Sequence, residues 1–145
     1  MQNVHPSLLL KGALTADALV SGGIAGLQLF GSQTLASWLA LPQPLLNATG
    51  AFLVPYAVVL LGLACSATVG SLLIWVIVLG NVGWAFGCIA LLAFGALITG
   101  YLGTAFLLVQ AAVVLMFAVL EYKGLQTSAS SNSSNAGVAR SAITR

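Results

Sequence analysis

The stretch ALVSGGIAGLQLF…VVLMFAVL, from Ala18 to Leu120, contains no Asp, Glu, Lys, Arg or His. A water-facing protein surface carries roughly a quarter of its residues as charges. A stretch of this length with none cannot cover a soluble domain, so it must face lipid. The charged residues nearest to it are Asp17 and Glu121, at its two ends.

The composition of the whole chain agrees with a membrane protein. Its 145 residues are 60% hydrophobic and 4% charged, and the length suits one domain. The net charge of +2 comes from scattered basic residues at Lys11, Lys123, Arg140 and Arg145. We therefore expect the lipid bilayer as a partner and no binding to nucleic acid.

The residues that usually carry chemistry are scarce. The one histidine, His5, and the two cysteines, Cys65 and Cys88, cannot supply a zinc site or a catalytic triad. The two cysteines fall at different depths of the predicted topology, so we expect no disulfide between them. The sequence thus predicts no enzyme, no metal and no cofactor.

Four apolar segments are separated by Gly, Ser, Thr and Pro. Each is at least 18 residues long, enough to cross a hydrocarbon core of about 30 Å as a helix. The segments cover about residues 9–30, 50–68, 72–98 and 101–122. The short links at Gly70–Ser71 and Thr99–Gly100 require antiparallel neighbours. We predict an all-α, four-transmembrane-helix bundle over residues 1–125.

The remaining parts of the chain are a link and a tail. Between the first two spans, Ser32 to Leu41 predicts a short helix in the membrane interface, with Trp38 at headgroup level. An apolar loop is the alternative, and Pro42 and Pro44 are expected to break the chain there. Residues 126–145 are rich in Ser and Asn, which predicts a disordered cytoplasmic tail.

The basic residues indicate the orientation. All of them lie before the first span or after the last, and the links between spans are uncharged. The positive-inside rule then places both termini in the cytoplasm. A cleaved signal peptide is the alternative for the N-terminus, but Asp17 and several glycines interrupt its apolar region.

The polar residues in the first and last spans have a regular spacing. Asp17 and Gln28 are separated by 11 residues, as are Gln110 and Glu121, so each pair lies on one helix face. Because these spans are antiparallel, Asp17 is level with Glu121 and Gln28 with Gln110. We predict that the two helices pack through a Gln28–Gln110 hydrogen bond, with both acids near the cytoplasmic rim.

The role of each polar residue stays open. Asp17 is either a structural residue in the first turn of a helix or a functional acid inside the membrane. Glu121 is expected to be an interfacial anchor. Asn81 lies in the third span on one stripe with Trp84 and Cys88, and either bonds another helix or binds a polar ligand.

Small residues recur four apart, a spacing that allows helices to approach closely. We expect tight helix packing at Gly22, Gly26, Gly62, Ser66, Gly83 and Gly87.

Several short segments resemble a family of small bacterial inner-membrane proteins that have four predicted helices and no assigned activity. These segments are GNVGW at 80–84, LGTAF at 102–106, VQA at 109–111 and LEYKGL at 120–125. ADAL at 16–19 and LALP at 39–42 resemble the N-terminal half of the family. The resemblance covers about residues 13–125 and implies a bacterial inner membrane. In layout the chain also resembles DoxX-like four-helix proteins.

Two classes of function remain. The first is a non-enzymatic accessory or assembly subunit that packs against other membrane proteins or itself. The second is a small homo-oligomeric, proton-coupled transporter in which Asp17 exchanges protons and substrate. An acid in the first of four short helices resembles the small multidrug-resistance exporters, although the rest of their pattern is not present. Nothing in the sequence favours a membrane enzyme acting on a quinone or lipid.

Overall fold

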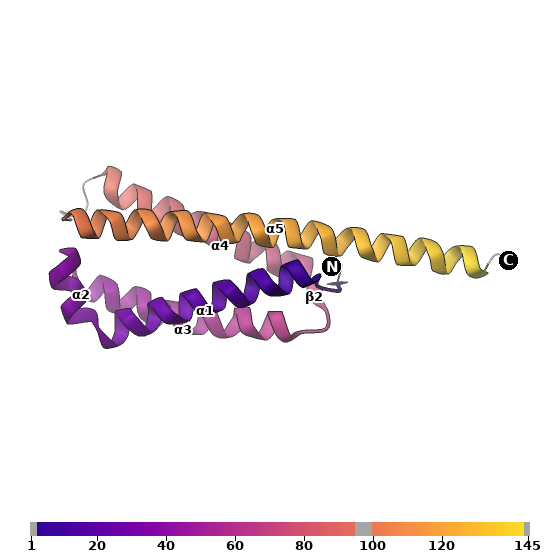
Figure 1. Ribbon diagram of the computed structural model, residues 1–145, viewed down its shortest axis with the longest axis horizontal. Coiled ribbons are helices and arrows are strands. Elements are labelled where there is room, and N and C mark those ends of the chain that lie inside the picture. Colours follow the sequence, from indigo (N-terminus) through magenta and orange to yellow (C-terminus); the bar gives the residue numbers. More distant parts are fainter. Residues whose placement is uncertain (1–2, 95–99, 144–145) are drawn as a thin grey trace.

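The computed structural model describes residues 3–94 and 100–143, with side chains up to residue 130. The chain forms an all-α bundle with one minimal strand pairing (Figure 1). Its elements are β1 (Asn3–Val4), α1 (Leu8–Phe30), α2 (Ser32–Leu39), α3 (Gln43–Cys65), β2 (Val69–Gly70), α4 (Ser71–Ala93) and α5 (Tyr101–Ile143). The predicted fold class is confirmed.

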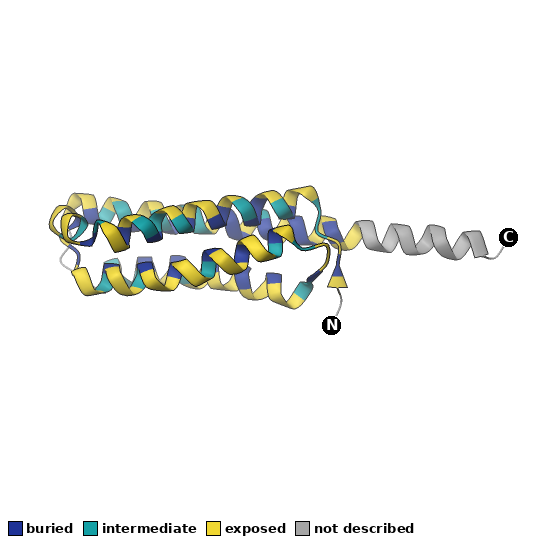
Figure 2. Cartoon of the chain, turned by 90° about the horizontal axis from the view of Figure 1, so that it is seen from below, coloured by how far each residue is buried: buried dark blue, intermediate teal, exposed yellow. Residues whose placement is uncertain are grey.

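Four of these helices are long and apolar enough to cross a membrane. They are Leu8–Phe30, Gln43–Cys65, Ser71–Ala93 and the Tyr101–Ser130 part of α5. Exposed residues cover the outside of the bundle in Figure 2, and many of them are large and apolar, as Leu19, Val58 and Phe86 illustrate. Such a surface is stable against lipid and unstable in water, so the chain is a multi-pass membrane protein.

The long helices pack pairwise. α1 lies along α3, α4 lies along α5, and contacts between α1 and α5 join the two pairs. The N-terminus and the turn from α3 to α4 lie at one end of the bundle, which we call the terminal end (Figure 1). α2 and the start of α5 lie at the opposite end, and α5 extends beyond the terminal end.

A short clasp closes the terminal end. Asn3 pairs with Gly70 and Val4 with Val69 in antiparallel register. His5 adds a contact of 3.2 Å between its Nδ1 and the carbonyl oxygen of Ala67. The clasp holds the N-terminal segment against the turn between α3 and α4.

The chain breaks between α2 and α3 at the prolines, as predicted, but the second span begins earlier than expected. α3 begins at Gln43, with Pro42 as its N-cap residue and Pro44 in its first turn, instead of near residue 50. The first turn of a helix needs no backbone N–H, and proline has the required φ already set. The prolines therefore start the second span.

The helix predicted between the first two spans is confirmed as α2. It ends at Leu39 because Ala40 adopts a left-handed conformation with φ of 52°. This turn directs the buried side chains of Leu39 and Leu41 into one apolar cluster with Leu46.

Two predicted boundaries differ from the structure. The third span was expected to reach residue 98, and α4 ends at Ala93, while residues 95–99 lie outside the described part. Residues 126–143 continue α5 as helix where the sequence predicts a disordered tail. The hydroxyl groups of Thr127 and Ser128 donate hydrogen bonds to the carbonyl oxygens of Lys123 and Gly124, one helical turn earlier. No proline interrupts the helix.

The glycines that bring helices together are largely not those predicted. An added Cβ at Gly22 would meet Ala57 at 3.8 Å, which is ordinary contact. A Cβ would meet nothing within 4 Å at Gly26, Gly62, Gly83 or Gly87, and the Ser66 hydroxyl bonds its own helix at Gly62. The closest approaches lie instead at Gly50 against Gln28 and Leu29, and at Gly124 against Leu10.

Gly124→Ala is expected to destabilise the bundle. The new Cβ would lie 2.7 Å from Cα of Leu10 and 2.9 Å from its backbone nitrogen, so α1 and α5 must separate. Overpacking of this kind costs about 1–3 kcal/mol, which a fall in the thermal unfolding temperature in detergent would report. Gly62→Ala is the control, because its Cβ meets nothing and alanine favours helix. Equal unfolding temperatures for the two variants would contradict the close approach.

Candidate functional site

One side chain from each long helix converges in the interior of the bundle. Asp17 comes from α1, Tyr56 from α3, Asn81 from α4 and Glu121 from α5, and Ser21 joins them one turn after Asp17. We call these five residues the central polar cluster. The exposed fractions of Asp17, Asn81 and Glu121 are 1%, 3% and 0%.

The amide of Asn81 connects the two acids. Its Nδ2 donates to Oδ2 of Asp17 at 3.0 Å and to Oε2 of Glu121 at 3.2 Å. The hydroxyl of Tyr56 lies 3.1 Å from Oδ2 of Asp17 and 3.0 Å from Oδ1 of Asn81. Ser21 donates to Oδ1 of Asp17 at 2.9 Å. The cluster is therefore one connected hydrogen-bond network.

One atom of the cluster has no partner. Oε1 of Glu121 is buried and accepts no hydrogen bond, and neither acid forms an ion pair within the described residues. A buried carboxylate oxygen without a donor or a cation is energetically costly. A proton on Oε1 or a cation beside it would lower this cost.

The count of hydrogen atoms points to a proton. Five contacts hold the network together, and the amide of Asn81 with the hydroxyls of Tyr56 and Ser21 supplies only four hydrogens. Turning the Asn81 amide over does not help, because both carboxyl groups must then donate to its oxygen. Either orientation requires at least one hydrogen on a carboxyl group for every contact to be a hydrogen bond.

The structure corrects the predicted depth of both acids. α1 begins at Leu8, capped by the hydroxyl of Ser7, so Asp17 lies roughly 14 Å along the helix and not in its first turn. Glu121 is fully buried and is not an interfacial anchor. The prediction that Asp17 and Glu121 are level is confirmed, because both bond the same amide of Asn81.

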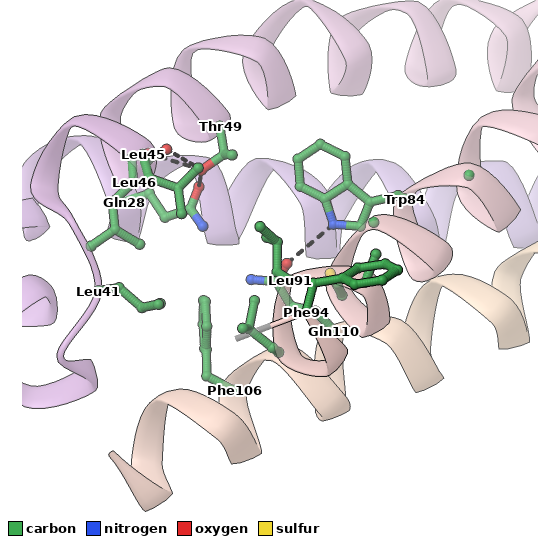
Figure 3. A pocket seen from close by; sticks show the side chains of 15 residues that line it. Gln28, Leu41, Leu45, Leu46, Thr49, Trp84, Leu91, Phe94, Phe106 and Gln110 are labelled. Atoms are coloured by element: carbon green, nitrogen blue, oxygen red, sulfur yellow. Dashed lines mark hydrogen bonds between the residues drawn. The ribbon is translucent and has the colours of Figure 1, made fainter. Parts of the chain in front are cut away.

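The predicted Gln28–Gln110 hydrogen bond is wrong. Oε1 of Gln28 instead lies 3.0 Å from the hydroxyl of Thr49, and Oε1 of Gln110 accepts from the indole Nε1 of Trp84 at 3.2 Å. α1 and α5 do pack together, as expected. The two glutamines lie on opposite sides of a cavity (Figure 3).

This cavity has a volume of about 650 Å³, and we call it the large cavity. It opens between the α1–α3 pair and the α4–α5 pair, in the half of the bundle away from the terminal end. Its polar lining consists of Gln28, Thr49, Gln110 and the indole of Trp84, and the rest is almost entirely apolar. A volume of several hundred Å³ is typical of sites for small organic ligands.

Two smaller cavities lie between the large cavity and the central polar cluster. One of about 140 Å³ is lined by Asp17 and Ser21, and the other, of about 120 Å³, by Tyr56 and Asn81. Trp84 lines all three cavities. The side chain of Trp84 therefore lies between the large cavity and the two cavities beside the central polar cluster.

Sequence reasoning missed Tyr56 and Thr49. Tyrosine and threonine in an apolar segment are usual near membrane interfaces, so neither residue was distinctive. The available signal was the position of Tyr56 inside its span, whereas Tyr101 and Tyr122 lie at the ends of theirs.

The described residues contain no group of three or more His, Cys, Asp or Glu side chains that could hold a metal ion. Cys65 is exposed and Cys88 is buried, and both are free thiols.

Comparison with protein-family models, with curated proteins and with solved structures finds no match for the chain. Inference about its function therefore depends on the geometry of the site.

Asn81→Leu is expected to lower the stability of the bundle. The substitution removes the donor that Asp17 and Glu121 share, and leaves both carboxyl groups with fewer partners in an apolar interior. A hydrogen bond of this kind contributes about 0.6–2 kcal/mol within a membrane, and thermal unfolding in nanodiscs measures the loss. Val82→Leu, at the exposed neighbouring position, is the control and should unfold as the wild type does. A stability of Asn81→Leu equal to that of Val82→Leu would contradict the network.

Proposed function

We propose that the protein is a non-enzymatic membrane transporter (a carrier). In this proposal Asp17 and Glu121 exchange protons for a transported substrate. The observation that supports this proposal is the pair of buried acids on one amide, with no basic partner among the described residues. A purely structural network needs no acids, because Asn, Gln and Ser side chains join helices at lower cost. Acids inside a membrane span are typical of proton relays and transporters.

Electrostatics explains how such a pair would couple two ligands. Two carboxylates that share one amide repel each other strongly in an interior of low dielectric constant. Loss of the last proton therefore becomes more favourable when another positive charge approaches. A proton and a cationic substrate would then compete for the same site, which is the requirement for exchange.

The cavities supply space beside the pair. The two small cavities lie against the central polar cluster, and the large cavity lies beyond Trp84. Movement of the Trp84 side chain would join the large cavity to the acids. We propose this route as the access from the side of α2.

The orientation follows from the basic residues. Lys11 and Lys123 lie toward the terminal end, and the positive-inside rule places that end in the cytoplasm. The family resemblance favours the inner membrane of a bacterium. In this orientation the large cavity lies in the outer half of the membrane.

A second candidate is an accessory or assembly subunit that packs against other membrane proteins. The observation that favours it is that the central polar cluster joins all four long helices, which is a structural role in itself. The accessory role requires no change in the protonation of the acids, so the two candidates differ in a measurable property.

Infrared spectroscopy of the protein in liposomes of ether lipids, which contain no other protein, tests the proposal. Asp17 and Glu121 are the only side-chain carboxyl groups in the chain, so few signals overlap. We expect the band of a protonated carboxyl group to disappear reversibly as the pH is raised. Asp17→Asn and Glu121→Gln should each change this titration, because the remaining acid has lost its neighbour.

Gln126→Glu, on the exposed face of α5, is the matched control and should add an independent titration without altering the first. A carboxyl band that stays constant over the whole pH range would favour the accessory subunit over the carrier.

Cysteine labelling tests the orientation. Cys65 is exposed at the terminal end of α3, so a membrane-impermeant maleimide should label it only after the cells are made permeable. Gln33→Cys, exposed on α2 at the opposite end, should be labelled in intact cells. The reverse pattern would place the termini outside.

A further inference from the structure

We propose that the large cavity binds an uncharged, mainly apolar molecule that carries a carbonyl oxygen, and that Gln110 donates a hydrogen bond to this oxygen. The inference goes beyond proton exchange and does not require it. Its basis is the fixed orientation of one amide inside an otherwise apolar cavity.

The partner of Gln110 determines which end of its amide faces the cavity. An indole N–H can only donate, so the atom that receives the bond from Trp84 at 3.2 Å must be the amide oxygen. The Nε2 group of Gln110 then points into the cavity, and it donates to no acceptor among the residues that the structure describes (Figure 3). A ligand that fits this group must present an acceptor.

Gln28 faces Gln110 from the other wall of the cavity. Its amide contacts the hydroxyl of Thr49, which also lies 2.9 Å from the carbonyl oxygen of Leu45. A hydroxyl can donate or accept, so Thr49 supports either orientation of the Gln28 amide. Gln28 can therefore add a second contact to a carbonyl or to a neighbouring hydroxyl of the ligand.

The remaining lining determines the body of the ligand. No charged residue lines the cavity, and Phe94 and Phe106 contribute aromatic rings beside the indole of Trp84. Burial of a charged group among such side chains would be costly, so the ligand that stays bound there is uncharged. Flat apolar molecules suit aromatic walls.

The surrounding lipid makes the hydrogen bond selective. Hydrocarbon tails offer no donor to a dissolved carbonyl compound, whereas Gln110 does. The free energy of transfer from lipid into the cavity is therefore more favourable for a ketone than for the hydrocarbon of the same shape. This difference is the property that an experiment can isolate.

Benzophenone is the probe for this experiment, because it is an apolar ketone that attaches to nearby C–H groups under ultraviolet light. The full-length protein in nanodiscs is titrated with benzophenone, irradiated and mapped by mass spectrometry. We expect saturable labelling in peptides that contain Leu91 and Leu107, two lining residues. Diphenylmethane, which has two hydrogens in place of the oxygen, should compete about tenfold less well after correction for partition into empty nanodiscs.

Gln110→Met keeps the side-chain length and removes the donor. It should weaken saturation by benzophenone about tenfold, and should reduce the preference over diphenylmethane. Gln126→Met on the exposed part of α5 is the control and should bind as the wild type does. Gln28→Met provides a second variant if Gln110→Met does not fold.

Two results would overturn the proposal. The first is labelling that does not saturate or that falls outside the cavity, and the second is equal competition by the ketone and the hydrocarbon. A comparison of ester-linked with ether-linked lipids distinguishes the sources of the carbonyl. Tighter binding of benzophenone in ether lipids would identify a lipid ester as the competing natural occupant, and equal binding would identify a free molecule.

Discussion

The structure depends on hydrogen bonds among a few polar side chains in the interior of the bundle. Neither water nor lipid supplies these groups with hydrogen-bond partners there. Asn81 donates to acids on two other helices, and Tyr56 brings the fourth helix to the same point. Apolar side chains gain little by packing together in lipid, so the helix arrangement must be specified by such directional contacts. The register of α1 against α5 follows, because the bonds of Asn81 align Asp17 with Glu121.

The central polar cluster and the large cavity lie in different halves of the bundle. The acids lie where the helix pairs meet, and the large cavity lies where the pairs diverge toward α2. Trp84 belongs to both regions, since its ring lines all three cavities and its indole orients Gln110. A change of the Trp84 rotamer would therefore alter the amide in the cavity and the space beside the acids together.

The coarse fold could be predicted because it follows from hydropathy and length, which need no knowledge of partners. The alignment of Asp17 with Glu121 could also be predicted, since spacing in antiparallel helices determines depth. The hydrogen-bond partners of Gln28 and Gln110 could not be predicted. Thr49 and Trp84 reach these amides because of how each helix is rotated about its axis, and this rotation cannot be read from one sequence. The close approaches at Gly50 and Gly124 were missed for the same reason, since a regular spacing of small residues does not show which face meets a neighbour.

The clasp at the terminal end has a consequence for biosynthesis. Asn3 and Val4 are synthesised before α1, and their pairing partners Gly70 and Val69 follow only after two spans have been made. The N-terminal segment must therefore wait unpaired while α1 and α3 enter the bilayer, and it can dock only onto a finished hairpin. Contacts of such long sequence separation form late in folding. Pairing of Asn3 and Val4 with the turn after α3 thus marks a late step of assembly, after insertion of the first two spans.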